Sequence, residues 1–398
     1  MFSHSFLWRS NVMVSNSMGL TTAWFLTFSR VFAWITIFLW ISFSPDSLSA
    51  EDSADKDSLK HAPLRLHDWQ RDGRNPIFVP VDEFDRRGSQ APFVILQDGT
   101  WWMFYAGIGE DGIQRICLAT ADPGSPTRWQ RHGPVLQLGV KGSFDELSAT
   151  YPRVHRINGR WHLYYSGRSS FESPQHFSNY RGIGLAVSDD LKHWTKHSPE
   201  PVLTGDGIPE YPENRSLVGL GNITELRQSD GRVRYRMYYT LLPGRRDPDW
   251  KTNGTWHIIE HKLCVAADSV DGIHWTDRRI VMERRRNVLS EDIAVVGLNV
   301  WQNSSGYHAV YTGLGTGNNT YSLAEAVSTD GLHWNRRKDQ GQEENVSLRP
   351  SASGWDSGMV GYPHLLIEGD RIRLFYNGAG GGATGIGMAT AKQQHSGP

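Results

Sequence analysis

Four acidic residues stand at one fixed spacing from the start of a β-rich run, and acids placed in this way could do chemistry. Asp85, Asp145 and Asp356 each precede a proline by seven residues, and Glu291 precedes Leu298 by the same distance. Two carboxyl groups that converge can act as a general acid and as a base or nucleophile. The repetition itself favours a structural role, because short acidic side chains commonly cap backbone turns.

Several polar residues in the same stretches do not recur from copy to copy, so they are better candidates for a specific site. They are Gln90, Glu146, Arg153, Glu213, Asn222, Asp292, Asn299 and His364. His364 could transfer protons near neutral pH, because an imidazole titrates in that range. A single histidine in a repeat can equally be an ordinary core residue with satisfied hydrogen bonds.

The elements that would position these residues recur along the chain. A strand-like run reaches a tyrosine five times, at Tyr105, Tyr165, Tyr239, Tyr311 and Tyr376. One β-rich run precedes each of them and another follows. A hairpin phrase, "SVDGIHW" (269–275), then introduces a fourth strand, and it returns as "STDGLHW" (328–334) and "SDDLKHW" (188–194). Four short strands repeated five times predict an all-β chain, a five-bladed β-propeller of four-stranded antiparallel blades.

The fifth repeat lacks its last strand. It stops after "GIGMATAK" (385–392), whereas "HDWQRDGRNPIF" (67–78) near the other end resembles the outer-strand phrase "RWQRHGPVL" (128–136). An open sheet edge would invite unwanted pairing. We therefore predict that the segment around Trp69 supplies the outer strand of blade five and closes the ring.

Composition and the first residues bear on class and location. The 398 residues include 16 Trp and 41 Gly with a net charge of −1, which suits a turn-rich globular protein and gives no basic excess for nucleic acid. Arg30, the apolar run 31–43 and the small residues 47–50 follow signal-peptide order. We expect residues 1–50 to be a leader cleaved near Ala50, giving a secreted or periplasmic monomer without further membrane contact.

The alternative is a signal anchor formed by residues 23–43, since about twenty apolar residues can span a bilayer. Residues 51–64 are expected to form a disordered linker, 65–393 the propeller and 394–398 a disordered tail. The two cysteines, Cys117 and Cys264, occupy the same place in different repeats. They are predicted to be buried thiols too far apart for a disulfide.

Two connections are much longer than the rest, at 168–182 and 241–258. Long loops over a rigid scaffold are where binding is expected. The remaining turns, such as "QDG" and "NG", are short. The face that carries the two long loops is therefore the candidate functional face.

The five repeats, the strands "WWMFYAG" (101–107) and "IRLFYNG" (372–378), the hairpin phrases and the leader together resemble the five-bladed propeller glycosidases. That superfamily includes arabinanases and xylosidases (family 43), invertases and levansucrases (32 and 68), agarobiose hydrolases (117) and mannoside phosphorylases (130). The resemblance covers roughly residues 65–393. The hairpin is also superficially similar to the sialidase Asp-box, but five repeats do not fit six blades.

The resemblance implies an exported glycoside hydrolase that acts on a plant or algal poly- or oligosaccharide. In these families three carboxylates begin the inner strands of the first three blades, whereas this chain has Ala91, Arg153 and Asn222 there. Hydrolysis would then use displaced carboxylates, with Asp145 or Glu146 from blade two and Glu291 or Asp292 from blade four as candidates. The separation of the pair decides retention or inversion. Otherwise the propeller binds carbohydrate without cleaving it.

By the same resemblance His364 could act as the acid, as in agarobiose hydrolases, or help to hold an axial cation. No cofactor is required, although a structural Ca²⁺ on the axis is conceivable. The basic residues expected to bind acidic or sulfated sugars are Arg153, Arg168, Arg181, Arg245 and Arg246. The aromatic residues suited to stacking on sugars are Tyr151, Tyr362, Trp250 and Trp256. Each of these could instead be packing or solvated surface.

Overall fold

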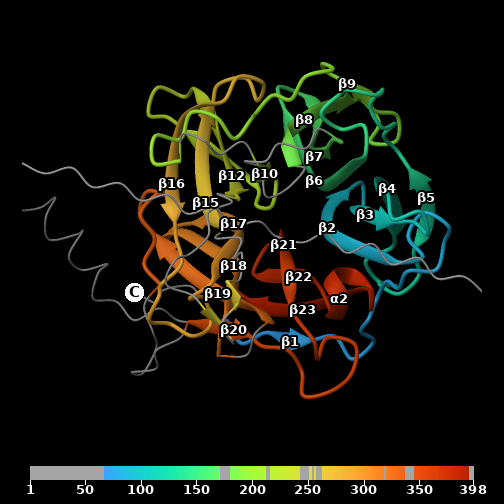
Figure 1. Ribbon diagram of the computed structural model, residues 1–398, viewed down its shortest axis with the longest axis vertical. Coiled ribbons are helices and arrows are strands. Elements are labelled where there is room, and N and C mark those ends of the chain that lie inside the picture. The colour runs from blue at the N-terminus through green and yellow to red at the C-terminus, as the bar shows by residue number, and fades with distance from the viewer. Residues whose placement is uncertain are drawn as a thin grey trace, which may run out of the picture. The chain divides into compact units, whose positions relative to one another are not determined.

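The computed structural model describes residues 67–170, 180–211, 216–242, 251–252, 255–256, 262–317, 320–336 and 345–393. These residues form five antiparallel sheets arranged around a ring (Figure 1), so the predicted five-bladed β-propeller is confirmed. The expected leader, linker and tail lie outside the described residues. Within the described part of the chain, no helix is long and apolar enough to cross a membrane.

Blades one and two each contain four consecutive strands. Blade one consists of β2 (Gly88–Gln97), β3 (Thr100–Ile108), β4 (Gln114–Ala121) and β5 (Gln130–Pro134). Blade two consists of β6 (Ser148–Ile157), β7 (Arg160–Arg168), β8 (Tyr180–Ser188) and β9 (Thr195–Lys196). Two-residue turns at Asp98–Gly99 and Asn158–Gly159 join their first strands, with positive φ at all four residues. Such turns match the twist of antiparallel pairs.

Blade four follows the same plan, whereas blades three and five depart from it slightly. Blade three has β10 (Leu217–Val218), β11 (Ile223–Arg227), β12 (Val233–Leu241), β15 (Leu263–Ser269) and β16 (Thr276–Met282). Blade four has β17 (Ala294–Asn303), β18 (Gly306–Gly315), β19 (Thr320–Ser328) and β20 (Val346–Leu348). Blade five has β21 (Gly361–Glu368), β22 (Arg371–Asn377), β23 (Ile386–Lys392) and β1 (Gln70–Arg71), with the short helix α2 (Ala379–Gly382) between β22 and β23. A separate hairpin pairs β13 (Lys251–Thr252) with β14 (Thr255–Trp256).

Strand β1 closes the ring as the sequence predicts. It pairs antiparallel with β23, and Figure 1 shows its blue arrow beside the red strands of blade five. The buried Trp69 donates its indole N–H to Glu325 of β19 over 2.9 Å, and the His67 ring lies 2.8 Å from the same carboxylate. The N-terminal segment is therefore fastened to blade four as well as to blade five.

The hairpin phrase with His and Trp is confirmed as architecture. In its second copy Asp271 accepts the backbone N–H of Ile273 and His274, and its carboxylate lies 2.7 Å from the His274 ring. The tryptophans of the three copies pack edge-on against the preceding blade: Trp194 on Phe104, Trp275 on Tyr164 and Trp334 on Tyr238. Each phrase thus caps its own turn and joins neighbouring blades.

The two cysteines are buried and unpaired, as expected. Burial raises the pKa of each thiol to about 12, because the thiolate is disfavoured away from water. Both therefore remain protonated packing residues.

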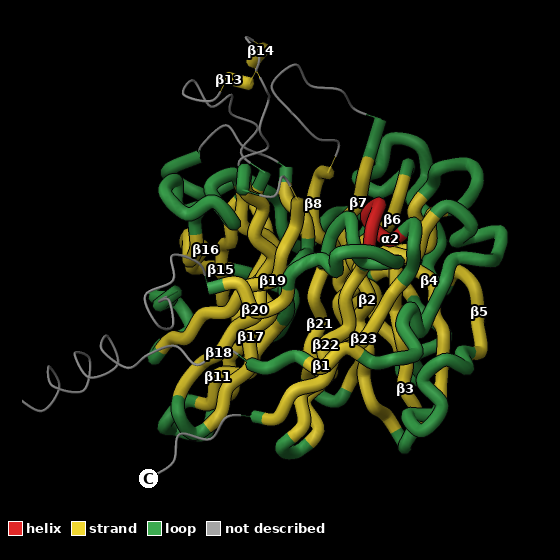
Figure 2. The backbone as a smooth tube through the Cα atoms, turned by 90° about the horizontal axis from the view of Figure 1, so that it is seen from below, coloured by secondary structure: helices red, strands yellow, loops and turns green. Residues whose placement is uncertain are grey.

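The strands cross from one face of the ring to the other (Figure 2). We call the face that holds the starts of the first and third strands the cavity face, and the face that holds the Asp98–Gly99 and Asn158–Gly159 turns the hairpin face. The strand ends that flank the two predicted long connections lie on the cavity face, and most residues of these connections lie outside the described part of the chain.

Candidate functional site

The inner strands of four blades contain a β-bulge close to the cavity face. The register with the second strand shifts between Gln90 and Phe93, Thr150 and Arg153, Val296 and Asn299, and Gly361 and His364. Inside the bulges, φ is +53° at Ala91, +55° at Tyr151, +68° at Gly297 and +53° at Tyr362. Positive φ is unfavourable for residues other than glycine and is concentrated at functional sites. Ala91, Tyr151 and Tyr362 are thereby brought into one cluster.

A cavity of about 210 Å³ opens where these bulges meet. It is lined by Tyr151, Tyr180, Val218, Leu220, Leu242, Lys262, Val296, Tyr321 and Tyr362. These residues come from blades two, three, four and five, so the cavity lies at the centre of the ring on the cavity face. We call it the tyrosine cavity.

The tyrosines of this cavity contact one another. The ring centroids of Tyr151 and Tyr362 are 6.0 Å apart, and those of Tyr321 and Tyr362 are 6.1 Å apart. Tyr180 donates its hydroxyl to that of Tyr151 over 3.3 Å, and Lys262 donates to the Tyr321 hydroxyl over 3.2 Å. Burial raises the pKa of Tyr151 well above its ordinary value, so the phenol stays neutral. The cavity thus offers aromatic faces, hydroxyl groups and one ammonium group.

A second layer of side chains lies next to the cavity, formed by the residue that follows each of the four bulges and by the residue at the matching position of blade three. Phe93, Arg153, Asn222, Asn299 and His364 occupy this same position in the five blades. The Phe93 ring lies 4.1 Å from the His364 ring and 5.5 Å from the Arg153 guanidinium. Four predicted site residues therefore do share one layer of the propeller.

Most polar atoms in this layer already bond to the backbone. Asn222 donates to the Val300 carbonyl and accepts its N–H, at 2.7 Å and 2.8 Å, which joins blades three and four. Asn299 donates to the Gly297 carbonyl over 2.8 Å. His364 donates from Nε2 to the Val94 carbonyl over 2.7 Å, which joins blades five and one. Asn222 and His364 thus hold neighbouring inner strands together, whereas Asn299 fastens the bulge of its own strand.

The environment of His364 bears on both roles expected for it. Burial and the nearby Arg153 and His155 lower the pKa of His364 to about 3, so the ring is neutral at pH 7. A calcium ion takes six to eight oxygen ligands, whereas this layer contains a guanidinium, a phenyl ring and no carboxylate. Among the described residues no three His, Cys, Asp or Glu side chains gather as ligands. The donor set beside His364 therefore does not fit Ca²⁺.

The repeated acids are held by the repeated tyrosines. The hydroxyls of Tyr105, Tyr165, Tyr311 and Tyr376 donate to Asp85, Asp145, Glu291 and Asp356, each twenty residues earlier in the chain. A basic side chain near the outer edge of the blade pairs with each acid: Arg131, Lys196, Arg336 and Arg71. Two catalytic candidates, Asp145 and Glu291, are thus 1 % exposed and ion-paired within their own blades.

The neighbouring acids Glu146 and Asp292 tie down loops. Glu146 accepts the Ser170 backbone N–H over 2.7 Å, and Asp292 accepts that of Thr316 over 2.7 Å, both across 24 residues. Each also accepts the hydroxyl of the same residue. The hydrogen bonds from Ser170 and Gly142 lower the pKa of Glu146 to about 2. Both carboxylates are half-exposed on the cavity face, but neither lines the tyrosine cavity.

The remaining predicted residues lie at different distances from the cavity. Gln90 accepts a 3.0 Å hydrogen bond from Gln114 at the edge of blade one. The Arg168 guanidinium lies 5.5 Å from the Tyr180 ring, and Arg181 donates to Ser169 over 3.3 Å. Glu213 and Trp250 lie outside the residues whose side chains are described.

Besides the apolar lining residues, three residues with polar groups were missed at the sequence level: Tyr180, Lys262 and Tyr321. They stand at the start of the third strand in blades two, three and four. Lys262 and Tyr321 each stand seven residues before the serine of a hairpin phrase and Tyr180 stands eight before it, so this spacing was a usable signal.

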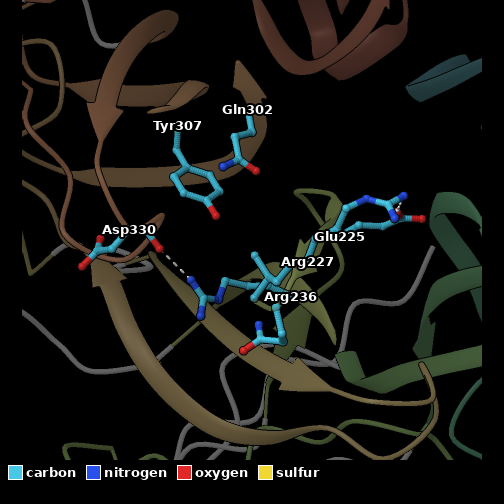
Figure 3. A pocket seen from close by; sticks show the side chains of 8 residues that line it. Glu225, Arg227, Arg236, Gln302, Tyr307 and Asp330 are labelled. Atoms are coloured by element: carbon cyan, nitrogen blue, oxygen red, sulfur yellow. Dashed lines mark hydrogen bonds and ion pairs between the residues drawn. The ribbon is translucent and has the colours of Figure 1, made fainter. Parts of the chain in front are cut away.

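A larger cavity of about 460 Å³ lies on the hairpin face between blades three and four (Figure 3). Its charged groups are already paired. Arg236 binds Asp268 through two nitrogens and donates to the Asp330 carbonyl, while Arg227 pairs with Glu225 over 3.2 Å. It is therefore the weaker candidate for a ligand site.

The chain was compared with family models, curated proteins and solved structures. No family model matches. An uncharacterized protein of Mycobacterium tuberculosis is 25% identical over 328 residues, which cover 81% of this chain and 98% of that protein. A 1,2-beta-oligomannan phosphorylase of Thermoanaerobacter sp. is 30% identical over 126 residues, 31% of this chain and 36% of that enzyme.

Solved structures match over most of the ring. A glycosyl hydrolase from Bacteroides ovatus has a TM-score of 0.60 at 17% identity, covering 83% of this chain and 95% of its own. A second structure has a TM-score of 0.59 at 18% identity, covering 83% of this chain and 97% of its own. It is described for the GH130 family of mannoside phosphorylases, which contains glycoside hydrolases that target beta-1,2 mannosidic linkages in Candida mannan. A thermostable family-43 glycoside hydrolase has a TM-score of 0.54 at 14% identity, covering 78% of this chain and 93% of its own. The chain is therefore a five-bladed β-propeller of the kind found in glycoside hydrolases of families 43 and 130.

Proposed function

We propose that the protein is an exported glycoside hydrolase that binds the end of an oligosaccharide in the tyrosine cavity. The observation that carries this proposal is the convergence of four tyrosines and a lysine from four blades on a space of about 210 Å³. At roughly 30 Å³ for each water, that space equals about seven waters, which suits a single sugar ring. Aromatic faces pack on the apolar face of a sugar, while phenol and ammonium groups bond its hydroxyls.

Bond cleavage is assigned to Glu146 and Asp292. They are half-exposed on the cavity face, whereas Asp145 and Glu291 are buried in ion pairs. Glu146, with a pKa of about 2, is ionised at neutral pH and suits the base or nucleophile, which leaves Asp292 as the acid. The mannoside-specific relatives and the resemblance to plant and algal glycosidases define the substrates to try first.

The test is incubation of the purified protein with β-1,2-mannooligosaccharides and with plant and algal oligosaccharides, followed by mass spectrometry. We expect at least one oligosaccharide to be shortened. Glu146→Gln and Asp292→Asn should each lower the rate about a hundredfold or more, the range of acid–base catalysis. Glu225→Gln on the hairpin face is the matched control and should leave the rate unchanged. N-terminal sequencing of secreted protein tests export, with cleavage expected near Ala50.

The second candidate is a propeller that binds carbohydrate without cleaving it. One observation favours it: among the described residues no carboxylate lines the tyrosine cavity. Binding of a sugar without a shortened product across the panel would support this function and reject hydrolysis of those sugars.

A further inference from the structure

Basic side chains surround the tyrosine cavity. Lys262 lines it, with its ammonium 5.9 Å from the centre of the Tyr321 ring. The Arg168 guanidinium lies 5.5 Å from the ring of Tyr180, another lining residue. Arg153 belongs to the adjoining layer, two residues after Tyr151. Among the described residues that line the cavity there is no acidic side chain.

Arg153 is the most informative of the three. It is 3 % exposed, and its bonds go only to main-chain carbonyls, those of Pro152 and Gly221. Pro152 follows the lining residue Tyr151, and Gly221 follows the lining residue Leu220, so the guanidinium bonds to the main chain next to two lining residues, although Arg153 is not itself part of the lining. Its Nη2 has no hydrogen-bond partner, and none of the described acids pairs with it.

The other buried arginine among the described residues has an acidic partner: Arg236 is paired with Asp268. The partly buried Lys196 is likewise paired with Asp145. Burying a cation without a counter-ion is strongly unfavourable, and such charges are normally paired or neutralised. Burial lowers the pKa of Arg153 to about 9, which still leaves it protonated at pH 7. An anion is therefore the partner that this guanidinium lacks.

We infer that the sugar bound in the tyrosine cavity carries a carboxylate or sulfate group, which Arg153 recognises with help from Lys262 and Arg168. A guanidinium presents parallel N–H groups that match the oxygens of such anions. This inference rests on the proposed function, because it names the class of sugar that the same cavity takes. It makes Arg153 a residue that determines specificity.

The test compares oligosaccharides that differ only in charge. An oligouronate and its carboxyl-reduced form, and a sulfated oligosaccharide and its desulfated form, are titrated into the full-length protein by calorimetry. We expect one acidic form to bind about tenfold or more tightly than its neutral form, the effect of one charge-assisted hydrogen bond. The preference should weaken as salt concentration rises.

Arg153→Met removes the charge at similar volume. It should abolish the preference for the acidic form while leaving thermal stability equal or higher, a combination that a merely structural arginine would not give. Arg236→Met on the hairpin face is the control and should lower stability but keep the preference. If Arg153→Met does not fold, the same oligosaccharides are titrated into Lys262→Met and Arg168→Gln. Each of these variants should reduce the preference for the acidic form.

The outcomes separate the two proposals. Equal affinity for acidic and neutral forms would overturn the inference, and cleavage of either form would still uphold the hydrolase. Preferential binding of an acidic form without cleavage would uphold the inference and reject hydrolysis. Tight binding of a neutral sugar only with added inorganic phosphate would overturn the inference, since the anion would then be separate from the sugar. Binding of no sugar at all would reject both.

Discussion

At the scale of single residues, the repeated acids show how similar side chains take different roles. Asp145 is buried between the Tyr165 hydroxyl and the Lys196 ammonium, whereas its neighbour Glu146 faces the solvent side of the same loop. The sequence placed both acids next to the candidate functional face. It could not separate them, because burial and pairing depend on residues twenty or more positions away.

Asp145→Asn should lower the free energy of unfolding by about 3 kcal/mol, because it leaves a largely buried ammonium group without its counter-ion. Urea denaturation at pH 7 measures this. The control is Asp189→Asn, which is exposed on the same blade and should change stability by less than about 0.5 kcal/mol. Unchanged stability with lost glycosidase activity would instead make Asp145 catalytic.

The two axial histidines predict a dependence of stability on pH. Burial lowers the pKa of His155 and His364 to about 3 from the ordinary value of 6.5. Between these values the unfolded chain binds more protons, so stability is full above pH 6.5 and falls as the pH drops toward 3. A change from pH 7 to pH 5 should lower the free energy of unfolding by about 2 kcal/mol for each histidine.

His364→Asn keeps a donor for the Val94 carbonyl and removes the titration, so unfolding free energies should depend less on pH in this variant. His193→Asn is the control, because that ring is exposed, and it should leave the dependence unchanged. An identical loss of stability with acid in His364→Asn and the unaltered protein would contradict this assignment.

At the scale of elements, the strands and the closure of the ring were predictable because they repeat. The resemblance of 67–78 to 128–136 identified β1 before any contact was known. The bulges were not predictable, since a shift of register leaves no mark in the hydrophobic alternation. The tyrosine cavity depends on those bulges, which contain Tyr151 and Tyr362. The lining residues at the starts of the third strands were therefore not recognised as their neighbours.

The N-terminal closure depends on one buried carboxylate. Glu325→Ala should remove the partners of His67 and Trp69 and lower the free energy of unfolding by about 2 kcal/mol or more. Thermal denaturation and limited proteolysis measure the effect, and cleavage should begin near β1. Glu110→Ala, an exposed acid of blade one, is the control. Unchanged stability and unchanged cleavage in Glu325→Ala would show that β1 alone closes the ring.

At the scale of the whole molecule, the ring separates two faces with different chemistry. The hairpin face carries a larger cavity whose charges are paired, whereas the cavity face carries a smaller one bordered by an unpaired guanidinium. The fold is shared with glycoside hydrolases, but the positions expected for their carboxylates hold Ala91, Arg153 and Asn222.

The most direct measurement is a crystal structure of the protein with an oligosaccharide that it binds or cleaves. We predict density for one sugar ring between Tyr151, Tyr321 and Tyr362, with an acidic group directed toward Arg153. Density for the sugar in the cavity beside Arg236, or at any site away from the axis, would contradict the assignment of the tyrosine cavity as the functional site.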